Sequence, residues 1–153
     1  MRVEAIRSAH RSRGDSATNR ILVTDAHARA CLAVARGLHE AGFAVDAAAA
    51  ERKRPAPAHW SRSVRERHLV PDPLEDPHGF LAMIEHLVAG GRYAALVHCG
   101  DASLLAISRG RDRLTPHLRL GLPPHEAVRR SLDKTALIAA ASRSGLRTPD
   151  TIA

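Results

Sequence analysis

The stretch RILVTDAHARACLAVARGLHEAGFAVDAAAA, residues 20–50, contains two apolar runs separated by a helical pattern. The first run, Ile21-Leu22-Val23, is short and continuous, as is typical of a fully buried strand. Apolar residues then recur at helical spacing until Gly42, a natural helix stop, and residues 43–45 predict a second strand. A strand, a helix and a strand within about 30 residues are typical of a right-handed parallel crossover.

The remaining chain repeats this alternation of strands and helices. Residues 67–71 and 93–101 predict a third and a fourth strand, and residues 118–123 an edge strand. Helices are predicted over residues 77–90, 101–107 and 124–131, and the basic connection at residues 51–63 contains Trp60, which we expect to anchor it against the core. The pattern predicts an α/β fold: a Rossmann-like, doubly wound, mostly parallel sheet of four to five strands with helices on both faces.

The composition agrees with a globular chain of about one domain. Its 153 residues include 44% hydrophobic and 25% charged residues, which is ordinary globular usage. Only 3% are aromatic, so the core must be built mainly from Ala, Leu, Val and Ile. Such a core suits helices packed on a small aliphatic sheet better than an aromatic-rich barrel.

The formal charge of +7 is carried almost wholly by arginine, because Lys53 and Lys134 are the only lysines. Arginine suits bidentate contacts with phosphate or carboxylate. The arginines are nevertheless spread along the chain, and no RNP-like motif, zinc-finger spacing or interleaving of aromatic and basic residues accompanies them. A general surface charge explains them better than a nucleic-acid partner.

Cellular location is indicated by the cysteines and by the apolar runs. Cys31 and Cys99 are far apart and form no CxxC or metal pattern, so we expect two buried free thiols in a reducing cytoplasm. No apolar run approaches the length of about 20 residues that a membrane span needs, and the amino terminus lacks the apolar core of a signal peptide. A cytoplasmic protein without a membrane partner is predicted.

Ligands of such sheets bind outside the carboxyl ends of the strands. After the first strand that edge carries Thr24, Asp25 and His27, and after the fourth it carries His98, Gly100 and Asp101. We take Thr24, Asp25, His98, Gly100 and Asp101 as candidates for a substrate pocket. Asp25 and Asp101 are each also suited to cap the helix that follows them, and this is the more ordinary role.

Several nucleotide and phosphate sites are excluded by the same loops. The turn TDAHARA, residues 24–30, has no glycine, so a classical NAD or FAD site is not expected. No GK[ST] Walker loop occurs, and Asp25 lacks the acidic neighbours of a phosphoacceptor site. The histidines have no metal-ligand spacing, and no catalytic residue and no metal ligand is assigned.

The order of several short segments is similar to the amino-terminal part of ATP-grasp carboxylate-amine ligases. The segments are ILVTDA, EAGF, VPDP, FLAMIEHLV and HCGD, followed by DKTALIAAASRSGLRTPDT at residues 133–151. The strongest piece is the Asp-Lys pair followed, after a helix, by Gly-Leu-Arg-Thr-Pro. The resemblance runs from about Arg20 to the last residue.

This resemblance implies a division of the chain and a reaction. Residues 20–131 would be a Rossmann-like pre-ATP-grasp domain, and residues 132–153 the first helix and turn of a truncated ATP-grasp module. Residues 1–19 lie before the resemblance; they are polar, basic and without sustained periodicity, which predicts a flexible basic tail. The cofactors implied are ATP and Mg²⁺, and the substrates a small-molecule carboxylate and an amine joined through an acyl phosphate. Lys134 is implied as a contact to the ATP phosphates, and Asp133 is expected to cap its helix.

On this reading the chain is not expected to be catalytic alone, because most ligands of ATP would lie beyond it. Two alternatives remain open at the level of sequence. The chain could be a stand-alone α/β binding module for a phosphorylated ligand or nucleic acid. It could also be the amino-terminal half of a sugar-nucleotide transferase, which could share the same sheet. Oligomeric state is not predicted.

Overall fold

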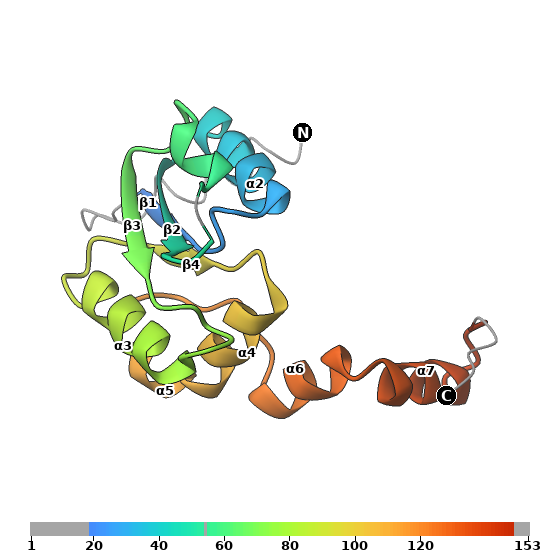
Figure 1. Ribbon diagram of the computed structural model, residues 1–153. Helices are drawn as coiled ribbons and strands as arrows, with labels where there is room; N and C mark the ends of the chain where they lie inside the picture. Colours follow the sequence, from blue (N-terminus) through green and yellow to red (C-terminus); the bar gives the residue numbers. More distant parts are fainter. Residues whose placement is uncertain (1–18, 54, 149–153) are drawn as a thin grey trace, which may run out of the picture.

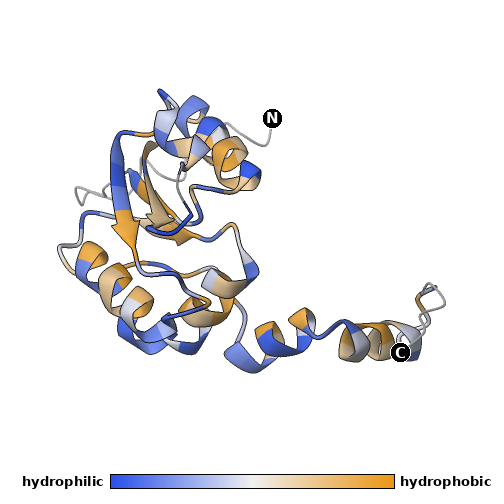
Figure 2. Cartoon of the chain, in the orientation of Figure 1, coloured by the Kyte–Doolittle hydropathy of each residue, from blue (hydrophilic) through white to orange (hydrophobic). Residues whose placement is uncertain are grey.

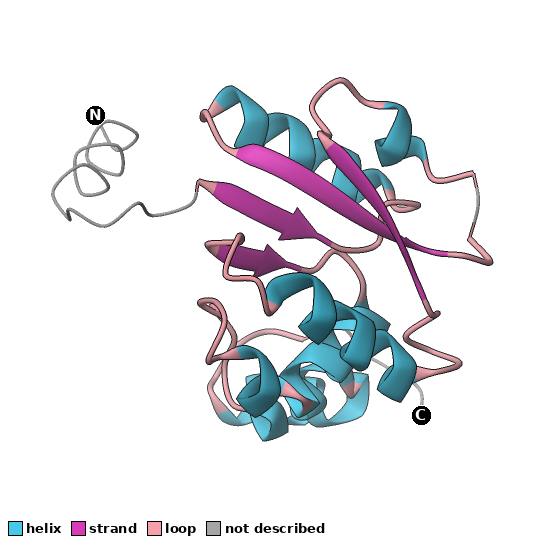
Figure 3. Cartoon of the chain, turned by 90° about the vertical axis from the view of Figure 1, so that its left-hand side faces the viewer, coloured by secondary structure: helices cyan, strands magenta, loops and turns pink. Residues whose placement is uncertain are grey.

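The computed structural model describes residues 19–53 and 55–148. Its centre is a parallel sheet with the strand order β3-β2-β1-β4, shown in Figures 1 and 3. The strands are β1 (Arg20–Val23), β2 (Ala44–Ala50), β3 (Glu66–Val70) and β4 (Ala95–Val97). All of the predicted basic tail except Asn19 lies outside the described residues, as does the Pro-Asp-Thr turn after Thr148.

Helices cover both faces of the sheet, as the sequence predicts (Figure 3). On one face lie α2 (Arg29–Glu40) and the short 3₁₀ helix η1 (Pro57–Trp60). The other face carries α3 (Pro77–Val88), α4 (Asp101–Arg109) and α5 (Arg111–Leu114). The predicted doubly wound α/β class is therefore confirmed.

The alternation of side chains along β2 explains how so few aromatic residues suffice. Val45, Ala47 and Ala49 pack on the face of α2, whereas Ala48 packs in the cluster that contains Phe80 and Tyr93. Small side chains let both helical layers approach a strand that is buried from both sides. In Figure 2 hydrophobic residues are accordingly prominent along β2, whereas β3 is hydrophilic over much of its length and hydrophobic at its end.

Several details differ from the sequence predictions. Cys31 is buried as predicted, but Cys99 is half-buried. β2 is longer than predicted, and α5 was not anticipated. Residues 118–123 form no strand, since their contact with the sheet is an isolated bridge between Arg119 and Ala95. Trp60 does not anchor its loop in the core: it is 76% exposed, and the guanidinium of Arg67 lies 5.9 Å from the centre of its ring.

Two further helices, α6 (His125–Leu132) and α7 (Lys134–Arg143), extend away from this body (Figure 1). α6 packs against α4 through the buried Val128, and Ser108 Oγ lies 2.9 Å from His125 Nδ1. α7 packs against α6 and has no buried residue. Within the described part of the chain, no helix is long and apolar enough to cross a membrane.

Two aspartates cap helices that differ in how much tertiary packing holds them. Asp133 accepts the amide hydrogen of Ala136 at 3.0 Å on α7, confirming the predicted cap, and Asp76 accepts that of Gly79 at 2.8 Å on α3. Removing such a cap costs about 1 kcal/mol. Because α3 carries core residues and α7 carries none, the same loss should be global in α3 and local in α7.

We therefore expect Asp133→Ala to accelerate amide hydrogen exchange within α7 while leaving the global denaturant midpoint unchanged. Asp76→Ala is the matched control and should lower the global stability by about 1 kcal/mol. Hydrogen exchange with denaturant unfolding of both variants checks this. An Asp133→Ala chain whose midpoint falls as far as that of Asp76→Ala would show that α7 is part of the cooperative core.

Candidate functional site

The loops that follow β1 and β4 lie side by side, because these strands are neighbours in the sheet. The amide of Thr24 donates to the carbonyl oxygen of Val97 at 2.9 Å. The Asp25 carboxylate accepts the amide hydrogen of Cys99 at 3.1 Å and the hydroxyl hydrogen of Ser103 at 2.5 Å. The structure thus brings Thr24 and Asp25 together with the loop that contains His98, Gly100 and Asp101.

Asp25 joins these two loops, and it is not the cap of α2. The residue that caps α2 is Ala28, which makes no side-chain cap bond, so the predicted role of Asp25 is wrong. Its φ of 62° places Asp25 in the left-handed region, which turns its carboxylate away from α2 and toward β4. Asp25 is 8% exposed and also accepts the hydroxyl hydrogen of Thr24 at 2.7 Å, so its Oδ2 accepts three hydrogen bonds from the protein.

The carboxylate of Asp25 lies close to the backbone of Gly100. A Cβ added at this position would lie 3.0 Å from Asp25 Oδ1 and 3.1 Å from its Cγ. Gly100 is also the N-cap residue of α4. Asp101, predicted to be this cap, is instead the first helical residue and is exposed, because the chain enters the helix one residue earlier than expected. A negative charge at this position is still favourable, because it lies at the positive end of the helix dipole.

Two histidines at this edge have the chemistry of ligand contacts. Burial lowers the pKa of His98, so its imidazole is neutral at pH 7 and can both donate and accept a hydrogen bond. Among the described residues, His27 Nδ1 is a buried side-chain nitrogen without a hydrogen-bond partner. Buried polar atoms normally have a partner, so His27 is the member of this edge that a polar ligand or a water would satisfy.

The edge extends to the other two strands, which the sequence reasoning did not include. Lys53 follows β2 and Asp72 follows β3, and their side chains form an ion pair of 3.1 Å between Nζ and Oδ2. The rule that located Asp25 and His98 also applies to these positions. The loops after β2 and β3 each carry several charged residues. The sequence does not indicate which of these side chains lie at the edge of the sheet.

Lys134 belongs to a helix that packs elsewhere than at this edge. It is exposed and is the first residue of α7, whose packing partner is α6. The sequence named it as a phosphate contact by resemblance, and this role stays a prediction.

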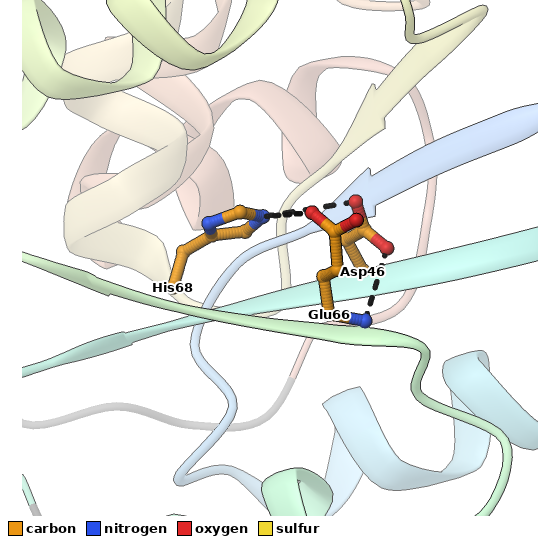
Figure 4. Close-up of side chains that lie close together, drawn as sticks. All are labelled: Asp46, Glu66 and His68. Atoms are coloured by element: carbon orange, nitrogen blue, oxygen red, sulfur yellow. Dashed lines mark hydrogen bonds and ion pairs between the residues drawn. The ribbon is translucent and has the colours of Figure 1, made fainter.

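A second polar cluster lies near the amino end of β2 and was not predicted (Figure 4). The fully buried Asp46 accepts hydrogen bonds from Tyr93 Oη at 2.5 Å, from Arg20 Nε at 2.7 Å and from the amide of Glu66 at 3.2 Å. His68 Nε2 lies 3.1 Å from Tyr93 Oη and 3.6 Å from Asp46 Oδ2. In the sequence, the signal for this cluster is a single aspartate, Asp46, inside an otherwise apolar strand.

The donor atoms of Asp46, Glu66 and His68 lie within 4.8 Å of one another, a spacing that could hold a metal ion. A cation is already supplied by the chain, however. The Arg20 guanidinium forms ion pairs with both Asp46 and Glu66, and Arg92 lies 3.6 Å from Glu66. Two arginines balance the two carboxylates, so the arrangement is a structural ion-pair network and not a candidate metal centre.

The Asp46 network should make stability depend on acid. Burial opposes ionisation of Asp46, but hydrogen bonds from Tyr93 and Arg20 hold its pKa below its ordinary value of 3.8. The hydrogen bond from Arg20 likewise holds the pKa of Glu66 below 4.5. A carboxylate with a lowered pKa in the folded state contributes stability above the pKa of the unfolded chain and loses it as pH falls through the folded value.

We therefore expect the free energy of unfolding to fall as pH decreases below about 4.5, and to change little from these two groups above that pH. Asp46→Asn cannot titrate, so its stability should fall less steeply over the same interval. Urea unfolding at a series of pH values measures both slopes. Equal slopes for the two proteins would contradict the contribution of Asp46.

Comparison with known proteins gives a likeness of structure without one of sequence. No protein-family model matches the chain, and no curated protein matches it. A solved structure with a similar fold is that of an L-amino acid ligase from Bacillus licheniformis, with a TM-score of 0.63 at 13% sequence identity. The match covers 88% of this chain and 32% of the ligase, so the chain spans about a third of that protein's length. The likeness supports a shared fold.

Proposed function

We propose that the chain is the amino-terminal, substrate-side domain of an ATP-dependent carboxylate-amine ligase of the ATP-grasp class. The observation that carries the proposal is the match of 88% of the chain to an L-amino acid ligase. It agrees with the ordered sequence segments that resemble this class. In this class ATP activates a carboxylate as an acyl phosphate, which an amine then attacks.

The part of the chain contributing to a substrate site would be the carboxyl edge of β1 and β4. His98 and His27 supply imidazole nitrogens, while Asp25 and Gly100 hold the two loops in position. Asp101 adds an exposed carboxylate at the start of α4, a group suited to an ammonium. A small molecule with both an amino and a carboxyl group fits this mixture of groups.

The described residues do not by themselves fit Mg²⁺ with ATP. Arg20 and Arg92 already pair with Asp46 and Glu66, and Lys134 is a single exposed cation at the start of α7. We therefore assign no chemical step to this chain, and we expect purified protein to release no ADP from ATP in the presence of amino acids. Release of ADP above the background of a denatured sample would overturn this expectation.

Substrate binding can be tested without catalysis. Titration of the isotopically labelled chain with glycine, L-alanine, L-glutamate and L-lysine should shift the amide resonances of His98 and Gly100 for at least one of them. His98→Ala should remove the shifts, whereas His78→Ala, at an exposed position on α3, should not. If none of the four amino acids moves these resonances, the proposed substrate edge is wrong.

A ligase domain and a nucleic-acid-binding module are also expected to differ in how salt affects their binding to DNA. A stand-alone module that binds through its arginines should bind mixed-sequence DNA with a steep slope of log K against log salt. We expect no such binding. The coding sequence after codon 153 provides a second test: continuation into lysine-bearing strands and a late cluster of Glu and Asn supports the ligase, and an immediate stop codon weakens it.

A further inference from the structure

The two edges of the parallel sheet differ in how the chain covers them. At the β4 edge, Ala95 forms a bridge with Arg119, whose amide donates to the carbonyl oxygen of Ala94 at 3.4 Å. At the other edge lies β3, and in the described part of the chain β2 is the only strand that pairs with it. An edge strand presents a row of backbone N–H and C=O groups with which another extended segment can pair.

A hollow lies directly beside this open edge. Its lining residues come from η1, from the two residues before it and from β3; they are Pro55, Ala56, His59, Trp60, Arg67 and Leu69. Arg67 and Leu69 are two residues apart on β3, so their side chains point to the same face of the sheet, the one that η1 covers. Trp60 is 76% exposed and Leu69 is 37% exposed, so the hollow offers apolar surface to the solvent.

The wall of the hollow that carries Trp60 is held in place by contacts with the sheet and the loop after β1. Ala58 is fully buried, and its amide donates to the carbonyl oxygen of Ala26 at 3.1 Å. His59 Nε2 lies 3.0 Å from the carbonyl oxygen of Ala47 on β2. The exposed ring of Trp60 therefore stands on a fixed element, and a preformed surface loses less entropy when a partner binds.

The charge that this edge offers to a partner is positive. Arg65 and Arg67 are exposed, and among the residues that the structure describes neither forms an ion pair with a carboxylate. The guanidinium of Arg67 lies 5.9 Å from the centre of the Trp60 ring, so a cation and an aromatic ring form one surface. Glu66, the carboxylate of β3, is already paired with arginines of the Asp46 network. An acidic partner is the one that this charge favours.

We propose that β3 binds an extended acidic peptide segment of another protein as an added strand. The backbone of the segment pairs with the open edge of β3. Alternate side chains of an extended segment point to the same face, so an apolar one enters the hollow beside Trp60 and Leu69, and an acidic one next to it on that face lies near Arg67. This surface is separate from the carboxyl edge of β1 and β4, so the proposal does not depend on the ligase assignment.

Trp60 is the only tryptophan of the chain, so its fluorescence reports on this surface alone. The probe is the capped peptide Thr-Glu-Thr-Phe-Thr-Glu-Thr, whose sequence is the same in both strand directions. Titration of the full chain should shift the Trp60 emission to shorter wavelength, with saturation, because the ring leaves water. Amide hydrogen exchange within β3 should slow when the peptide is bound.

Three variants and a second peptide test the role of each group. The peptide with lysine in place of both glutamates should bind about tenfold more weakly, and Arg67→Glu should reverse this preference. Arg36→Glu, at an exposed position on α2, is the matched control and should bind both peptides as the wild-type chain does. Trp60→Ala, followed by amide resonances, should abolish binding. Equal binding of both peptides to the wild-type chain would contradict an acidic partner.

Three further results would overturn the proposal. An unchanged Trp60 emission up to millimolar peptide would show that the edge does not take up such a segment. A shifted emission without slower exchange in β3 would show that the peptide contacts Trp60 but does not add as a strand. An emission that depends on protein concentration without peptide would show that a second copy of the chain covers this edge instead.

Discussion

Replacement of Asp46 by alanine should lower the free energy of unfolding by about 3–5 kcal/mol, the cost of breaking a buried ion pair on one side. Asp46 is fully buried and accepts hydrogen bonds from Tyr93, Arg20 and the amide of Glu66. Without it the Arg20 guanidinium, whose side chain is only 13% exposed, loses its buried counter-ion. Chemical unfolding followed by circular dichroism measures the loss.

Glu126→Ala is the matched control for this experiment. Glu126 also forms an ion pair with an arginine, Arg129, but both side chains are about 60% exposed. Exposed pairs contribute little to stability, so this variant should unfold at the wild-type midpoint. Asp46→Asn keeps the size of the side chain and should be destabilised less than Asp46→Ala. If Asp46→Ala is as stable as Glu126→Ala, the network does not stabilise the sheet.

Replacement of Asp25 by alanine should also be strongly destabilising, by about 3 kcal/mol, because buried donors lose their acceptor. Those donors are the hydroxyl groups of Thr24 and Ser103 and the amide of Cys99. Alanine also strains the backbone at a φ of 62°, which glycine adopts freely. The measurement is again chemical unfolding at neutral pH.

Asp25→Gly separates the two contributions. It loses the same hydrogen bonds but carries no left-handed strain, so it should be more stable than Asp25→Ala by about 1 kcal/mol. Equal stability of the two variants would show that the backbone conformation costs nothing at this position. Wild-type stability of both would show that the carboxylate does not hold the loops together.

The fold class could be predicted from sequence because the spacing of apolar residues marks each strand and helix locally. Residues 20–50 contain a complete strand, helix and strand, and their apolar spacing depends on local geometry alone. The ends of the strands were predicted less accurately than their existence. β2 continues to Ala50 because β3 pairs with it over Asp46–Ala50, and that pairing partner is about twenty residues away.

The candidate site was predicted in position but not in the roles of its residues. The carboxyl-edge rule located Asp25 and the loop from His98 to Asp101, and the sheet order then placed them together. Capping rules assigned both aspartates to the helices that follow them. Asp25 departs from that rule because its left-handed backbone turns the side chain toward β4, a conformation that no local pattern indicates.

By itself the sequence determined most of the strands and helices, and that polar groups gather at one edge of a parallel sheet. These properties depend on periodicity and on glycine stops, which act between residues close in the chain. Only the tertiary structure decided that Asp46 faces Arg20 and Tyr93, and that Asp25 faces Ser103. These contacts depend on the strand order β3-β2-β1-β4, which brings distant segments together through burial and pairing that no local pattern encodes.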